Sequence, residues 1–317
     1  MASEAELIAA LGEIFFHPRP DILLGIGDDG AVIRVSQHDQ VAVADMAVEG
    51  VHFKRSWSGL AEIGAKIAAA NFADIFAMGA KPSYILITAG LPKDFSVVQI
   101  RELAEGIQAE CNLVGAVAVG GDLSISETMV ISITAIGSLE DNKKAIPRSG
   151  AKAGENIVIS DLPGWSAAGL EMLQSGKVLD TPAARRALDL HRKPKVGYKK
   201  AALLAESGAT SMIDISDGLH SELMHLAKAS GVQFSIDPEL LSAIPDFKLL
   251  KALAEELDTD VWKWVLGGGE DHHFLATLES GIPIPEGSWV IGRTNEGSGI
   301  AVKGFPAEFE GGYRHFG

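Results

Sequence analysis

The residues most suggestive of chemistry in this sequence are carboxylates placed beside glycines or after short apolar stretches. Asp28 and Asp29 lie between Gly27 and Gly30, and the same arrangement recurs further along the chain at Asp45, Asp74, Asp122, Asp214, Asp217 and Glu270–Asp271. Hard divalent cations bind carboxylate oxygens, and glycines let phosphate groups come close to the backbone. The pattern therefore predicts a site for divalent cations and a nucleotide.

The segment from Gly25 to Gly30 also matches the dinucleotide fingerprint G-x-G-x-x-G. That fingerprint requires a helix after its third glycine, because the helix amino terminus receives the pyrophosphate. The β-branched residues that follow, Val32, Ile33 and Val35, favour a strand instead. We therefore interpret the segment as a metal-bearing turn. The sequence contains no Walker loop, so bound Mg²⁺ rather than a loop lysine would neutralise any phosphates.

Three of the aspartates have alternative interpretations. Asp74 lies in an apolar helical pattern, where a carboxylate must be paired, protonated or bound to a metal, so a salt bridge and metal ligation both remain open. Asp217 could cap the helix that follows it. Capping does not explain Asp214, which lies within an apolar strand pattern. We keep both capping and metal or nucleotide binding for this pair.

Composition restricts the classes of partner. The formal net charge is −15, which argues against nucleic acid as a ligand because its phosphates bind through Lys and Arg. Cys111 is the single cysteine, so an internal disulfide and a thiolate metal cluster are excluded. The sequence shows no signal-peptide pattern and no apolar run of the roughly 20 residues that a membrane helix needs. We expect a cytoplasmic protein without a membrane partner.

Hydrophobic periodicity predicts alternating helices and strands. Helices are expected at 3–16, 60–79, 96–113, 181–210 and 219–230, and strands at 31–35, 40–44, 83–91, 116–119, 129–136, 156–160, 211–215 and 274–278. This alternation indicates an α/β or α+β fold. The pattern restarts near Pro147, and we place a boundary there between an amino-terminal domain (1–146), with a mixed sheet and helices, and a carboxy-terminal α/β domain (147–317).

Several blocks in order resemble the thiamine-monophosphate kinase family, of the superfamily that includes aminoimidazole ribonucleotide synthetase. The resemblance runs from Gly25 to the carboxyl end. The blocks are Gly25–Ala31, Asp45–Phe53, Ala70–Ala80, Gly120–Asp122, Arg148–Lys152, Gly164–Leu170, Ile213–Leu219, Gly268–Asp271 and Gly312–Phe316.

This resemblance implies ATP-dependent phosphorylation of thiamine monophosphate to thiamine diphosphate, by a homodimer joined through the sheets of its amino-terminal domains. That domain would bind metal and ATP. Several Mg²⁺ ions would be held by Asp29 (with Asp28 adjacent), Asp45, Asp74, Asp122, Asp214 and Asp217. ATP would contact Gly121, Asp122, Arg148 and Ser216, and thiamine phosphate would contact His52, Glu270 and Tyr313. A general base is not required, because a substrate phosphate oxygen is already an anionic nucleophile.

The chain departs from the family pattern in several places, including Asp161–Trp165, where an acidic residue often precedes the serine, and Tyr313, where tryptophan is also common. Val43 and Ala44 stand where hydroxyl residues usually precede the aspartate, and His272–His273 stands where an aromatic and a polar residue are usual. Two alternative functions stay open. One is another ATP-dependent reaction of the same superfamily, and the other is nucleotide binding with impaired catalysis.

Overall fold

The structure is a computed structural model that describes residues 4–16, 18–24, 32–34, 38–177 and 179–305. The chain divides into two compact units, which are described separately. The first consists of Met1–Ile75 with Ala80–Lys144, and the second of Phe76–Gly79 with Ala145–Gly317. Asp28, Asp29 and Tyr313 lie outside the described residues.

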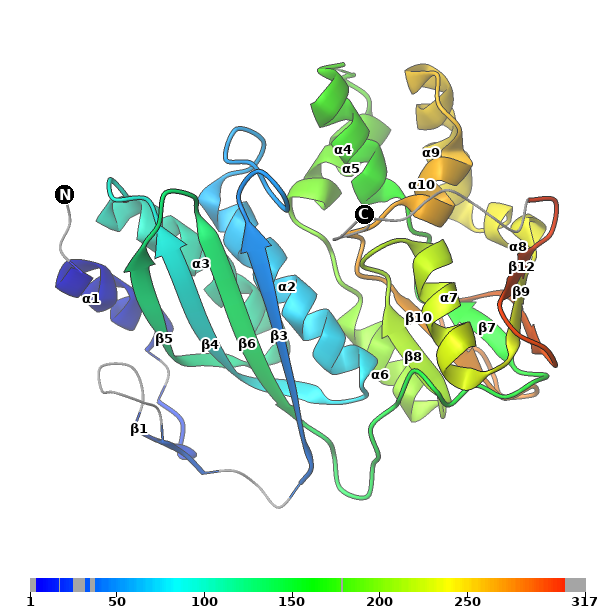
Figure 1. The fold of residues 1–317 in the computed structure, drawn as a ribbon, viewed down its shortest axis with the longest axis horizontal. Coiled ribbons are helices and arrows are strands. Elements are labelled where there is room, and N and C mark those ends of the chain that lie inside the picture. The colour runs from blue at the N-terminus through cyan, green and yellow to red at the C-terminus, as the bar shows by residue number, and fades with distance from the viewer. Residues whose placement is uncertain (1–3, 17, 25–31, 35–37, 178, 306–317) are drawn as a thin grey trace. The chain divides into compact units, whose positions relative to one another are not determined.

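A four-stranded mixed sheet forms the centre of the first unit, with strand order β3-β6-β4-β5. Helices α2 and α3 cover one of its faces (Figure 1). Strands β4 and β5 are parallel and the other pairs antiparallel. The elements are α1 (Glu4–Phe15), β1 (Ile22–Leu24), β2 (Val32–Ile33), β3 (Gln40–Val48), α2 (Leu60–Ala77), β4 (Lys81–Leu91), α3 (Val97–Val114), β5 (Val117–Ile125) and β6 (Val130–Ser138).

Alternation along β6 shows which face of this sheet carries the core. Ile131, Ile133 and Ala135 are fully buried, whereas Ser132 and Thr134 between them are only partly buried. Successive strand residues point to opposite faces, so the odd-numbered residues of β6 face the helices. Residues of β3 and β4 that pair with these β6 residues lie on the same face as their partners.

Helices α2 and α3 approach closely at two glycines. A Cβ built on Gly106 would lie 1.9 Å from the carbonyl oxygen of Ala61, and one built on Gly64 would lie 2.2 Å from that of Leu103. Both obstacles are backbone atoms, which cannot rotate away as a side chain would. The two helices can therefore lie this close only because neither glycine has a side chain.

Gly106→Ala is expected to lower the free energy of unfolding by about 1–3 kcal/mol, because the methyl group would force the two helices apart. The matched control is Gly12→Ala in α1, where no atom lies within 4 Å of the added Cβ. Urea unfolding of both variants measures the effect. A Gly106→Ala protein as stable as Gly12→Ala would contradict the close approach.

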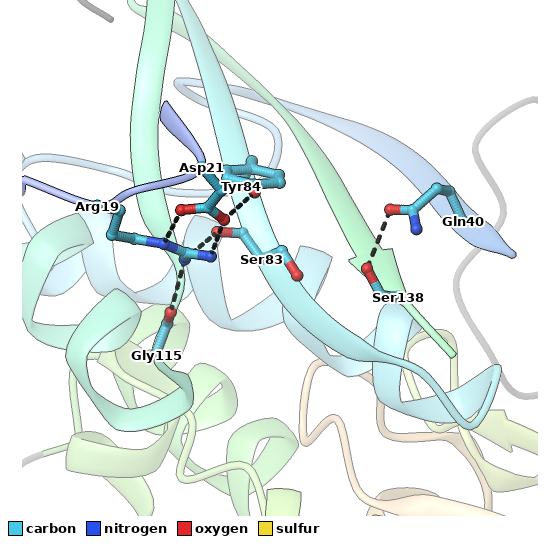
Figure 2. Close-up of polar contacts among 7 residues, drawn as sticks. All are labelled: Arg19, Asp21, Gln40, Ser83, Tyr84, Gly115 and Ser138. Atoms are coloured by element: carbon cyan, nitrogen blue, oxygen red, sulfur yellow. Dashed lines mark hydrogen bonds and ion pairs between the residues drawn. The ribbon is translucent and has the colours of Figure 1, made fainter. Parts of the chain in front are cut away.

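The segment that leads into β1 is fixed to the sheet by a cluster of polar contacts (Figure 2). Arg19 donates from Nε and Nη2 to the two oxygens of Asp21, at 3.0 and 2.6 Å, and from Nη1 to the carbonyl oxygen of Ser83 at 3.3 Å. The Tyr84 hydroxyl donates to Asp21, and the Arg19 guanidinium lies 5.0 Å from the centre of the Tyr84 ring. Mainly because of Arg19, the pKa of Asp21 is lowered to about 2.

This cluster predicts an acid dependence of stability. Because the pKa of Asp21 falls from 3.8 to about 2 on folding, its stabilisation is present above pH 4 and is lost as the pH falls towards 2. Asp21→Asn should therefore lose less unfolding free energy between pH 5 and pH 2.5 than the unaltered protein. Urea titrations at the two pH values measure this difference. Equal losses would contradict the role of Asp21.

The second unit contains a six-stranded sheet with order β12-β9-β11-β7-β10-β8. The β12–β9 pair is parallel and the others are antiparallel. Trp165, Phe234 and Phe274 are among its largest fully buried side chains. Its strands are β7 (Asn156–Ile159), β8 (Ser211–Asp214), β9 (Gln233–Ile236), β10 (Phe274–Leu278), β11 (Trp289–Asn295) and β12 (Ile300–Val302).

The helices of the second unit pack on one another and on the sheet. Helices α4, α5, α9 and α10 pack together, and α10 also contacts α7, which packs on strands β8, β9, β10 and β12 (Figure 1). The bounds are α4 (Trp165–Ser175), α5 (Pro182–Arg192), α6 (Tyr198–Glu206), α7 (Leu219–Ser230), α8 (Pro238–Ser242), α9 (Pro245–Leu257) and α10 (Val261–Gly267). None of the helices described is long and apolar enough to cross a membrane.

The predicted mixed α/β architecture is confirmed, as are the helices expected at 60–79, 96–113 and 219–230. Two expectations about local structure are wrong. Asp45 and Asp122 lie inside β3 and β5 rather than at the ends of strands. The helix expected at 181–210 is divided into α5 and α6, because Pro194 disfavours helical backbone at Lys193, and α6 already ends at Glu206.

Candidate active site

Two predicted site residues of the first unit, Asp45 and Asp74, lie at or near the β3 edge of its sheet. The backbone N–H of Asp45 donates to Oδ1 of Asn71 on α2 at 3.2 Å, and Asn71 is fully buried. Asp74 lies three residues further along α2, which places it on the same side of the helix as Asn71. The structure thus brings the β3 aspartate and the α2 aspartate to one region.

His52 lies in the turn after β3 and has a defined tautomer. Its Nδ1 accepts a hydrogen bond from the backbone N–H of Val48 at 3.0 Å. Because an N–H group can only donate, Nδ1 must carry the lone pair, and the ring proton is on Nε2. His52 therefore offers an N–H donor, which suits an anionic or carbonyl group of a substrate.

Asp122 lies on β5, at the other edge of the same sheet. Asp45 pairs with Ile133 on β6, and Asp122 pairs with Thr88 on β4. Ile133 and Thr88 are one residue out of register with each other across the sheet, so the two aspartates lie at nearly the same height on opposite edge strands. Three strand spacings separate them, or roughly 14 Å. Gly121 packs so tightly that an added Cβ would lie 1.8 Å from the carbonyl oxygen of Ile87. Within one sheet, Asp45 and Asp122 are too far apart to bind the same ion.

In the second unit, two loops hold the predicted residues together at the end of β8. Glu270 N donates to Ser216 O at 2.7 Å, His272 N to Ile215 O at 3.0 Å, and Ile215 N to His273 O at 2.6 Å. These backbone bonds join the loop after β8, with Ser216 and Asp217, to the loop before β10. Glu270 and His272 both have positive φ, of 64° and 52°. Left-handed backbone is strained for residues other than glycine and often occurs at functional sites.

Asp214 ends β8 and is almost completely buried. Its Oδ2 lies 2.9 Å from Nδ1 of His272, and the two side chains are 5% and 8% exposed. Asp217 and Ser216, both partly buried, follow it in the loop. The predicted metal and nucleotide residues of this unit are therefore close to one another.

Glu222 is a buried carboxylate of this region that sequence analysis did not identify. Its side chain is 2% exposed, accepts a hydrogen bond from Asp217 N at 3.2 Å and pairs with His225 Nδ1 at 2.9 Å. Burial and the nearby charge of Asp214 raise the pKa of Glu222, partly offset by His225. An available signal was its position in the first turn of α7, where carboxylates interact favourably with the helix dipole.

Contacts that the sequence did not reveal hold Asp271 and Glu270 in place. Oδ2 of the buried Asp271 accepts from Gly164 N at 2.6 Å and its Oδ1 from Ser166 N at 3.0 Å, at the start of α4. Nδ1 of the buried His191 lies 3.1 Å from Ser166 Oγ and 3.6 Å from a carboxylate oxygen of Glu270. Because these residues are far apart in sequence, no local pattern predicts the contacts.

Arg148 lies apart from Ser216. Its carbonyl oxygen accepts from Ser230 Oγ at 3.0 Å, at the carboxyl end of α7, whereas Ser216 precedes the amino end of that helix. A 12-residue helix is roughly 18 Å long. The backbone of Arg148 therefore lies at the opposite end of α7 from Ser216, although both residues are predicted to touch ATP.

The carboxylates suit a magnesium site in which the substrate supplies the remaining ligands. Within the described residues, no cluster of three or more His, Cys, Asp or Glu side chains could hold a metal alone. Mg²⁺ typically uses one or two carboxylates together with substrate phosphates and water. The pairs Asp45–Asp74 and Asp214–Asp217 supply that number of oxygen ligands and no thiolates. The donor set therefore suits Mg²⁺ rather than zinc.

Comparison with known proteins identifies the family. The AIR synthase related protein N-terminal domain model matches residues 27–139, and the C-terminal domain model matches 152–304. A thiamine-monophosphate kinase of Mycobacterium tuberculosis is 37% identical over 100% of this chain and 95% of the relative. The chain belongs to the thiamine-monophosphate kinase family. A family member from Corynebacterium glutamicum is also 37% identical, over 92% of this chain and 88% of its own.

A solved structure of the thiamine-monophosphate kinase family, AaThiL complexed with AMPPCP and TMP, has the same fold. It superposes with a TM-score of 0.81 at 30% identity and covers 99% of this chain and 97% of its own. The resemblance that the sequence motifs predicted is confirmed. The individual roles of the predicted site residues stay predictions.

Proposed function

We propose that this protein transfers the γ-phosphoryl group of ATP to thiamine monophosphate, producing thiamine diphosphate and ADP. The observation that carries the proposal is family membership along the whole chain, together with the similar structure that binds an ATP analogue and TMP. The sequence blocks that would contact both substrates are present, and most of them lie on defined strands, helices and turns.

The transfer needs positioning and charge neutralisation more than acid–base chemistry. An oxygen of the thiamine phosphate attacks the γ-phosphorus, the bond from that phosphorus to the β-phosphate oxygen breaks, and ADP leaves with the electron pair. His52 would donate its Nε2–H to the substrate, and Glu270 would contact it from the loop before β10. Gly121, Asp122, Arg148 and Ser216 would bind ATP.

Magnesium would supply charge neutralisation between the two mutually repelling phosphate groups. The residues proposed to hold the ions are Asp29, Asp45, Asp74, Asp122, Asp214 and Asp217. Since the described residues offer carboxylates in pairs, Mg²⁺ should bind tightly only when ATP supplies further oxygens. We also propose a cytoplasmic location, because ATP is abundant there and the chain has no disulfide to form.

The direct test is to incubate the purified protein with ATP, Mg²⁺ and thiamine monophosphate and to separate the products by chromatography. Thiamine diphosphate and ADP in equal amounts are expected. ATP binding without any product would instead support the alternative of a binding protein with impaired catalysis. Product from other substrates of the superfamily, but not from thiamine monophosphate, would support a different ATP-dependent reaction.

We further propose that the protein acts as a homodimer joined through the sheets of its first unit. Two observations support this. Asp45 and Asp122 lie on opposite edges of the sheet, and exposed apolar side chains occur on the same edge strands, with Met46 of β3 58% exposed and Ile125 of β5 74% exposed. If β5 of one copy lay beside β3 of the other, Asp122 would lie on the strand next to the one that carries the other copy's Asp45.

Mixing two inactive variants tests this arrangement. Asp45→Asn and Asp122→Asn dimers should each be inactive. After subunit exchange, about a quarter of all sites would regain both aspartates if each site uses one from each copy, because half of the dimers are mixed and each mixed dimer has one intact site. No recovery after demonstrated exchange would contradict a shared site, and a monomer in sedimentation would contradict the dimer itself.

A further inference from the structure

His272 makes a side-chain contact that the proposed reaction does not itself explain. Its Nδ1 lies 2.9 Å from Oδ2 of Asp214, and both side chains are buried. An ionised carboxylate only accepts hydrogen bonds, so Nδ1 must carry the proton. The contact is a charge-assisted hydrogen bond, which is stronger and more directional than one between neutral groups.

The backbone around His272 leaves the ring little freedom. His272 has a φ of 52°, its N–H donates to Ile215 O, and the neighbouring His273 O accepts from Ile215 N. The next residue, Phe274, pairs with Asp214 across the β10–β8 ladder. The donor and the acceptor therefore sit on two segments that are fixed to each other by backbone hydrogen bonds.

Only one oxygen of Asp214 is used by this contact. Among the described residues, His272 is the sole hydrogen-bond partner of the Asp214 side chain, through Oδ2. A carboxylate held at one oxygen cannot rotate to present either oxygen to a ligand. The other oxygen, Oδ1, is then fixed in one direction.

We propose that His272 is a positioning residue, which holds Oδ2 of Asp214 by its Nδ1–H and thereby presents Oδ1 to a divalent cation. The inference rests on the proposed Mg²⁺-dependent transfer. Groups that orient a metal ligand typically change metal affinity about 10–100-fold when they are removed. In this role His272 itself touches neither substrate nor metal.

Two amide substitutions test whether the position of the N–H donor matters, rather than the size of the side chain. His272→Asn places an N–H donor where Nδ1 lies, and asparagine tolerates the left-handed backbone. His272→Gln carries the same amide one atom further out, at the position of Nε2. Calorimetric titration of Mg²⁺ into each variant, saturated with a non-hydrolysable ATP analogue, measures cation affinity without turnover.

We expect His272→Gln to weaken Mg²⁺ binding about 10–100-fold and His272→Asn to restore most of it. Equal weakening in both variants, or none in either, would overturn the proposal. The proposed function can fail independently, because the titration needs no product. Should His272→Gln not fold, ¹⁵N-histidine NMR of the unaltered protein decides the matter: a proton on Nδ1 of His272 is expected, and an unprotonated Nδ1 would overturn the proposal.

Discussion

Asp214→Asn is expected to lower kcat by about 10²–10³-fold, the range typical for loss of one group that stabilises charge in a transition state. Asparagine has nearly the same shape, and its amide oxygen can still accept the hydrogen bond from His272. The fold should therefore survive, while a negative charge that would bind Mg²⁺ next to the phosphates is lost. Steady-state assays of thiamine diphosphate formation measure the effect.

The matched control is Asp180→Asn. Asp180 is 84% exposed and pairs with Arg185, away from the candidate site, so its loss should leave kcat unchanged. Thermal unfolding of both variants checks that they are folded. If Asp214→Asn is folded and turns over as fast as Asp180→Asn, Asp214 does not take part in binding the metal.

The second large effect expected is on stability. Asp271→Asn should lower the free energy of unfolding by about 2–4 kcal/mol, because an amide accepts through one oxygen only and would leave Gly164 N or Ser166 N buried without an acceptor. The loss is limited because burial raises the pKa of Asp271, so the native carboxylate already bears a desolvation cost.

Asp260→Asn provides the matched comparison, since it makes the same substitution at another helix start. Asp260 is exposed and caps α10 by accepting from Trp262 N at 3.0 Å, and asparagine caps a helix about as well as aspartate. Urea unfolding should show little change for this variant. Similar losses for the two variants would contradict a special role for the buried carboxylate.

Local sequence signals predicted much of this fold for clear physical reasons. The helix at Leu219–Ser230 has strong periodicity, and the strand at Phe274–Leu278 is a short buried run that follows the triple glycine. The boundaries of β3 and β5 were missed, because Asp45 and Asp122 were treated as the points where strands stop. Pairing with β6 and β4 carries both strands past these residues, and tertiary pairing of that kind overrides local propensity.

The candidate site was predictable where motif residues lie close in sequence, as with Asp214, Ser216 and Asp217. Contacts between distant segments could not be predicted. Glu222 was hidden because a single carboxylate in a helix usually faces solvent, and His191 because its contacts with Ser166 and Glu270 join three separate elements. Local periodicity also says nothing about the order of strands, which places Asp45 and Asp122 on opposite edges.

The proposed reaction is direct transfer of the γ-phosphoryl group from ATP to thiamine monophosphate, without a protein nucleophile. The most direct measurement uses ATP made chiral at the γ-phosphorus with oxygen isotopes, followed by analysis of the thiamine diphosphate formed. One in-line displacement predicts inverted configuration at the transferred phosphorus. Retention would reveal a phosphorylated protein intermediate, and absence of the transferred phosphoryl group from thiamine diphosphate would contradict the reaction itself.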